Sequence, residues 1–100
     1  MSSFDTGPQP KSQNATTSSV PSSASAVTLL AANQDREAAS IFNDSTAILY
    51  VKFGSSASTS SYKVQIAASG YFEFPQPIYT GIVTGIWASE NGNARISEEY

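Results

Sequence analysis

The chain has 100 residues and can therefore form one domain of modest size. Its five basic and eight acidic residues give a formal net charge of −3, and no Lys/Arg cluster is present, so we expect no nucleic-acid partner. Cys and His are absent, which excludes disulfides, Cys-based metal sites and the commonest general base. These absences predict a protein with no cofactor and no enzymatic activity.

Only 13% of the residues are charged, against a norm of about 25%. Ser, Thr, Ala and Asn take their place, which favours a β protein with polar loops over a helical bundle. No apolar run approaches the roughly 18 residues of a membrane helix, so we expect no membrane contact. The start of the chain has neither a basic segment nor an apolar signal core, so Sec secretion is not expected.

Residues 1–25 are predicted to be a flexible or extended N-terminal arm. The segment is rich in Ser, Thr, Pro, Asn and Gln, and Pro8, Pro10 and Pro21 exclude a helix. It has too little apolar surface to offset the entropy of ordering.

Two interpretations of the arm remain open. It is either a tail without a role or a segment that orders on a partner, with Phe4 and Val20 as apolar anchors. The second interpretation predicts that deleting residues 1–23 leaves the fold intact and weakens binding to the partner.

The segment 40–53 is predicted to be a central β-hairpin. Two apolar runs, 41–42 and 48–53, flank a polar turn at 43–46, and the second run is rich in β-branched and aromatic residues. Asn and Asp at the turn tolerate left-handed backbone and bond to their own chain.

Further strands follow from alternating or β-rich runs bounded by turn residues. The predicted strands are 26–30, 38–43, 48–53, 62–67, 71–74, 82–88 and 94–97. Asn91 and Gly92 are typical of a tight hairpin turn, so the last strand is expected to pair with 82–88. The only candidate helical turn is 35–40.

About seven short strands with turn signals every 8–12 residues predict an all-β fold. We expect a small antiparallel β-sandwich, jelly-roll-like or Ig-like, over residues 26–100, with the arm extending from it. A small barrel, or a flatter sheet with one short helix, is the alternative.

A domain of this size obtains only about 3–5 kcal/mol from its core, so we expect a homo-oligomer. The aromatic residues are also more numerous than one small core can hide. Some should face a partner, and Tyr79 and Trp87 are the candidates. Trp87 with neighbouring tyrosines could instead stack on a sugar, although core or interface positions are favoured.

The sequence gives little support for a metal site or a catalytic site. Asp35, Glu37 and Asp44 do not match the spacing of an EF-hand calcium loop. The abundant serines lack a His base. Glu98 and Glu99 are adjacent and are interpreted as part of a solvated C-terminus.

The body of the chain resembles a group of small structural proteins from the virions of tailed bacteriophages. The matching runs are VTLLAAN (27–33), ASIFNDST (39–46), LYVKFG (49–54) and GIVTGIWASENGNAR (81–95). The resemblance spans about residues 27–98 and does not include the arm. The group offers no catalytic motif to carry over.

This resemblance implies a virion component with a β-sandwich body, similar to capsid decoration (cement) proteins. Such proteins lie on the exterior of the phage head, often as trimers, and join neighbouring subunits of the major capsid protein. The chain would be made in the host cytoplasm. The alternatives are a head–tail connector, tail or fibre-base component, and a carbohydrate-binding adhesion module.

Overall fold

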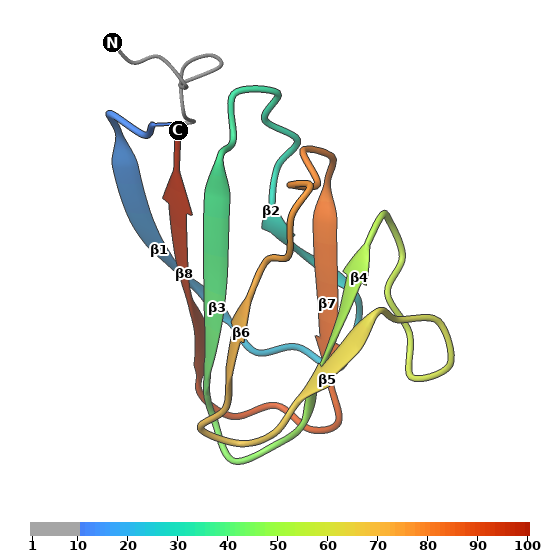
Figure 1. Cartoon of the computed structure of the whole chain (residues 1–100). Coiled ribbons are helices and arrows are strands. Elements are labelled where there is room, and N and C mark those ends of the chain that lie inside the picture. Colours follow the sequence, from blue (N-terminus) through green and yellow to red (C-terminus); the bar gives the residue numbers. More distant parts are fainter. Residues whose placement is uncertain (1–10) are drawn as a thin grey trace, which may run out of the picture.

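The computed structural model describes residues 11–100, so Phe4 lies outside the described residues. Residues 11–100 form eight β-strands and no helix (Figure 1). The strands are β1 (Ala15–Pro21), β2 (Val27–Leu30), β3 (Ala38–Asp44), β4 (Leu49–Phe53), β5 (Val64–Ile66), β6 (Tyr71–Glu73), β7 (Val83–Trp87) and β8 (Asn93–Glu99).

The strands make two antiparallel sheets of four strands each. The first sheet has the order β1-β8-β3-β6, and the second has the order β2-β7-β4-β5. Together they form a small β-sandwich, which confirms the predicted fold class. One strand more than expected is present because β1 was predicted as part of the arm.

The core lies between the sheets and follows the alternation of the strands. In β3, every second residue from Ala39 to Asn43 is buried, and in β8 Ala94 and Ile96 are buried. The largest fully buried apolar side chains of the two sheets are Ile41, Leu49, Val51, Val83, Trp87 and Ile96. Both sheets therefore contribute one apolar face, as a sandwich requires.

The central hairpin that we predicted over residues 40–53 is wrong. β3 and β4 do form, but β3 pairs with β6 and β8, whereas β4 pairs with β5 and β7. The turn at 45–48 thus carries the chain from one sheet to the other. The reason is that Asn43 does not act as a turn residue: its side chain is fully buried and binds the crossing chain from within.

The second predicted hairpin is also wrong. β7 and β8 belong to different sheets, and β8 runs between β1 and β3. Gly92 does adopt a positive φ of 78°, but Asn91 is not among the positive-φ residues, so the two-residue hairpin turn is not formed. The Gly92 carbonyl instead accepts a hydrogen bond from the Ser22 N–H at 3.0 Å.

Residues 15–21, which we placed in the arm, are extended but form part of the sandwich. They pair with β8 along their whole length, from Ala15 opposite Glu99 to Pro21 opposite Asn93. Val20 packs against the core. Deleting residues 1–23 would remove this strand as well as the residues before it, so that deletion does not separate the arm from the sandwich.

Candidate functional site

Arg36 is buried at one end of the sandwich, the end where Lys11 and Tyr100 lie. Its side chain is fully buried, and Nε donates to Glu98 Oε2 at 2.8 Å. Nη1 donates to the carbonyls of Tyr79 (2.8 Å) and Gly81 (3.1 Å), and Nη2 donates to that of Ala31 (2.7 Å). Through these contacts the guanidinium holds two loops against β8, so the role of Arg36 is structural.

Asn43 plays the corresponding part at the opposite end. Its Nδ2 donates to the carbonyls of Ala47 (2.8 Å) and Ile66 (2.9 Å), and its Oδ1 accepts from Trp87 Nε1 at 3.2 Å and from Ser45 Oγ at 2.7 Å. Within the described residues, no buried side-chain nitrogen or oxygen lacks a hydrogen-bond partner. The interior therefore holds no polar group poised for a ligand.

The side of the sandwich between β5 and β6 is filled by aromatic rings. Phe53 stacks on Tyr79 with the centroids 4.7 Å apart and 7° between the planes, and it also contacts Phe72 and Phe74. Lys63 Nζ lies 5.1 Å from the Phe53 centroid, a cation–π contact. These rings pack against the core and cover it on this side.

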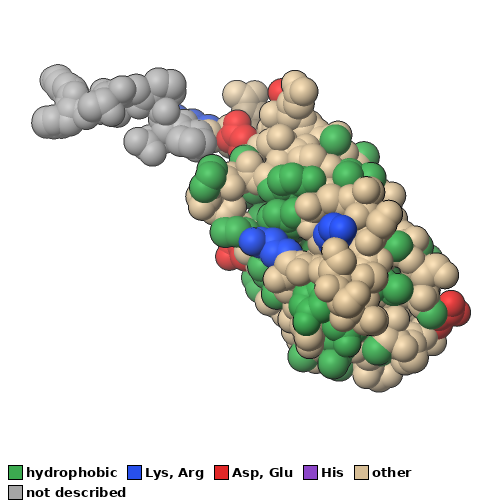
Figure 2. Space-filling view, turned by 90° about the vertical axis from the view of Figure 1, so that its right-hand side faces the viewer, with side chains coloured by type: hydrophobic (Ala, Val, Ile, Leu, Met, Phe, Trp, Pro, Cys, Tyr) green, Lys and Arg blue, Asp and Glu red, His purple; other side chains and the backbone are tan. Residues whose placement is uncertain are grey.

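The outer surface of this side carries a shallow hollow with basic and aromatic walls. It is about 340 Å³ in volume and is lined by Lys52, Phe53, Ser61, Tyr62 and Lys63. Figure 2 shows this side of the molecule, with hydrophobic side chains exposed beside Lys and Arg side chains. Tyr62 is 39% exposed and packs edge-on against Tyr50, with the centroids 5.1 Å apart.

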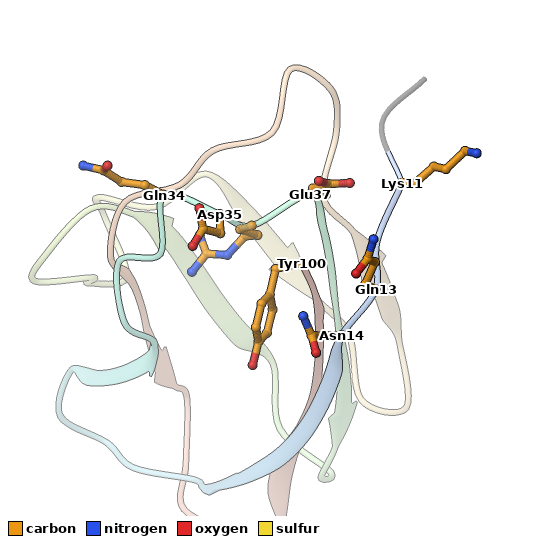
Figure 3. A pocket seen from close by; sticks show the side chains of 8 residues that line it. Lys11, Gln13, Asn14, Gln34, Asp35, Glu37 and Tyr100 are labelled. Atoms are coloured by element: carbon orange, nitrogen blue, oxygen red, sulfur yellow. The ribbon is translucent and has the colours of Figure 1, made fainter. Parts of the chain in front are cut away.

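A larger groove of about 490 Å³ lies where the N-terminal segment meets the C-terminus. It is lined by Lys11, Gln13, Asn14, Gln34, Asp35, Arg36, Glu37 and Tyr100 (Figure 3). In Figure 3 the Tyr100 ring lies in the middle of the groove, whereas Gln34 and Lys11 point outward. The walls offer amides, carboxylates and a phenol, which suit hydrogen bonding to another polypeptide.

Main-chain hydrogen bonds fix the N-terminal wall of this groove. The N–H groups of Gln13 and Asn14 donate to the Tyr100 carbonyl at 3.1 and 2.7 Å, and the Tyr100 N–H donates to the Asn14 carbonyl at 2.8 Å. Gln13 and Asn14 thus continue the pairing of β1 with the C-terminal end of β8. In residues 11–100, no group of three or more His, Cys, Asp or Glu side chains could hold a metal ion.

The structure does not bring the predicted partner-binding residues together. Phe4 lies outside the described residues, and Val20 packs on the core from β1. Tyr79 is half-buried under Phe53. Trp87 is only 1% exposed and is bonded to Asn43, so its assignment as a partner-binding or sugar-stacking residue is corrected: the indole belongs to the core.

Arg36 and Asn43 were missed as organising residues because both lie beside turn residues in the sequence. For Arg36 a signal did exist. Ala94, Ile96 and Glu98 alternate along the last strand and so share its inward face, which places a carboxylate at the margin of the core. A buried carboxylate needs a cation, and Arg36 supplies it. The solvated C-terminus predicted for Glu98 is therefore corrected.

Comparison with protein-family models, with curated proteins and with solved structures finds no match to this chain. The part of the chain described by the structure includes no helix long and apolar enough to cross a membrane.

Proposed function

We propose that this chain is a non-enzymatic structural protein of a phage virion that decorates the outer surface of the head. The proposal starts from the resemblance to small virion proteins over residues 27–98. The segments that carry the resemblance include strands β2, β4 and β7, nearly all of β3 and the start of β8. The partner is the major capsid protein, and the contact is made by residues 1–12 of the arm and the adjacent groove.

The observation that supports this proposal best is the attachment of the N-terminal segment to the sheet. β1 pairs with β8 over seven residues, and Gln13 and Asn14 continue the pairing to Tyr100. A partner that holds residues 1–12 is therefore coupled to the sandwich through a ladder of main-chain hydrogen bonds. Many copies bound in this way on a symmetric shell would be retained even if each contact were weak.

The proposal is tested by the copy number of this chain in purified particles of the phage that encodes it. Quantitative mass spectrometry against the major capsid protein should give a ratio near one to one. A few copies per hundred capsid subunits would instead assign the protein to the connector, tail or fibre base. Absence from the particle would overturn the structural function altogether.

The role of the arm is tested by deleting residues 1–11, which leaves the strand β1 and its anchor at Asn14 in place. We expect the truncated protein to bind particles stripped of this chain at least about tenfold more weakly, a loss of about 1.4 kcal/mol, with unchanged thermal unfolding. Tyr71→Ser, at an exposed residue in β6, is the matched control and should bind normally. Equal binding by the truncated and full-length proteins would remove the arm from the contact.

A further inference from the structure

The four sheet edges of the described sandwich differ in how they are protected. β5 and β6 are three residues long, and β6 ends shortly before Pro75 and Pro77. β2 is four residues long, and its pairing with β7 shifts register between Thr28 and Leu30. Short strands, prolines and irregular pairing are the means by which proteins block unwanted edge pairing.

β1 has little of this protection beyond Pro21, its last residue, which has no N–H to offer. It is seven residues long with the sequence ATTSSVP, carries no charge, and is exposed at every position except the half-buried Val20. Its pairing with β8 runs from Ala15 to Pro21 without a shift in register. A long, regular and uncharged edge strand is a template for another strand.

The hydrogen-bond pattern identifies which groups of β1 are free to pair. Asn14 and Tyr100 exchange both of their main-chain hydrogen bonds, and the Ser22 N–H donates to Gly92, so even-numbered residues of β1 face β8. In an antiparallel ladder the alternate residues direct their N–H and C=O groups to the opposite side. Ala15, Thr17 and Ser19 therefore present their main-chain groups outward, away from the sheet.

We propose that this edge pairs with β1 of a second copy of the chain, antiparallel and about a two-fold axis. With Ser18 opposite Ser18, Thr17 lies opposite Ser19 of the other copy, and their outward N–H and C=O groups match reciprocally. The first sheets of the two copies, four strands each, then become one continuous eight-stranded sheet.

The chemistry of β1 favours a second copy over a charged foreign strand. Self-pairing opposes small, neutral side chains, whereas a charged strand pairing with itself would oppose like charges. The Arg95 side chain beside β1 is already neutralised, since it donates to Asp44 Oδ2 at 2.9 Å and to Ser19 Oγ at 2.7 Å. The charge of Arg95 therefore does not oppose the approach of the two strands.

This inference does not rest on the proposed virion function, and it predicts a dimer in place of the trimer that the resemblance implies. The full-length protein, analysed by sedimentation equilibrium, should move from one chain toward two as its concentration rises from about 10 µM to about 1 mM, the range of a weak contact. The amides of Ala15, Thr17 and Ser19 should gain protection from hydrogen exchange over the same range.

Thr17→Pro removes an outward N–H without removing a hydrogen bond to β8, and it should abolish association. Thr17→Ser keeps that N–H and is the matched control, which should associate like the parent. Thr17→Lys, which places like charges near the two-fold axis, should weaken association at least about tenfold at low salt and less at high salt. Normal Trp87 fluorescence verifies that each variant is folded.

Three results would overturn the inference: a monomer throughout the concentration range, a trimer, or association that persists in folded Thr17→Pro. Association without protection of the outward amides would equally overturn it, because another surface would then make the contact.

Discussion

The two ends of the sandwich are each held by one buried polar residue, and the two residues work differently. At one end the charged Arg36 joins Glu98 and the carbonyls of two loops. At the other end the neutral Asn43 joins Trp87 and the carbonyls of Ala47 and Ile66. In both cases one side chain donates to carbonyls of separate segments and holds these segments together.

Arg36 and Asn43 differ in the groups that are left unpaired when each side chain is removed. Without Arg36, the Glu98 carboxylate, only 13% exposed, loses its ion-pair partner and retains only the hydrogen bond from Asn33 Nδ2 at 3.3 Å. Without Asn43, only neutral groups are left unpaired. Leaving a charge buried and unpaired costs more than leaving a neutral group unpaired. The charged end of the sandwich should therefore be the more sensitive to substitution.

The largest expected effect is that of Arg36→Met, which keeps the volume of the side chain and removes its charge. The free energy of unfolding should fall by about 3–5 kcal/mol, the usual cost of breaking a buried ion pair. Because small domains have about 5–15 kcal/mol of stability in total, the variant should be close to unfolding. Urea denaturation followed by Trp87 fluorescence measures the loss.

The matched double variant Arg36→Met/Glu98→Leu separates the charge from the rest of the site. Replacing both partners by apolar residues removes the unpaired carboxylate, so the double variant should be more stable than Arg36→Met alone. Some of the loss should remain, because the carbonyls of Ala31, Tyr79 and Gly81 have still lost their donor. A double variant less stable than the single one would show that the ion pair is not the main contribution.

Asn43→Leu tests the neutral end and should have the next largest effect. The substitution leaves the Trp87 N–H and the Ile66 carbonyl without this partner inside the core, whereas the Ala47 carbonyl keeps the hydrogen bond from Ser45 Oγ. The expected loss is about 2–3 kcal/mol, since an unsatisfied buried neutral group costs about 1–3 kcal/mol. Urea denaturation of Arg36→Met and Asn43→Leu side by side ranks the two losses in the free energy of unfolding. A larger loss for Asn43→Leu would contradict the expected order.

The sequence predicted where the strands lie better than which strands pair. Val83–Trp87 and Ala38–Asp44 were found within a residue or two because β-branched and alternating runs favour extended, half-buried chain. Both predicted hairpins were wrong because a turn signal marks a local reversal of direction and does not specify the sheet that the next strand joins. In this chain both turns carry strands across the core.

A single sequence also does not show which groups a buried polar side chain binds. Asn is a residue type that is common in turns. Only the folded chain shows that the Asn43 amide is enclosed by three crossing segments. Trp87 was a candidate contact residue for the same reason, since an aromatic side chain suits an interface as well as a core. Tertiary packing decides between these roles.

The smallest expected effect is that of Arg95→Gln, which removes the second ion pair of the described residues. Arg95 and Asp44 are 2.9 Å apart, but their side chains are 51% and 48% exposed. Water and salt screen such a pair, so the free energy of unfolding should change by less than about 1 kcal/mol. In 1 M NaCl this change should shrink further, whereas the loss caused by Arg36→Met should persist because that pair is shielded from solvent. If the two substitutions responded to salt alike, burial would not be what distinguishes the two ion pairs.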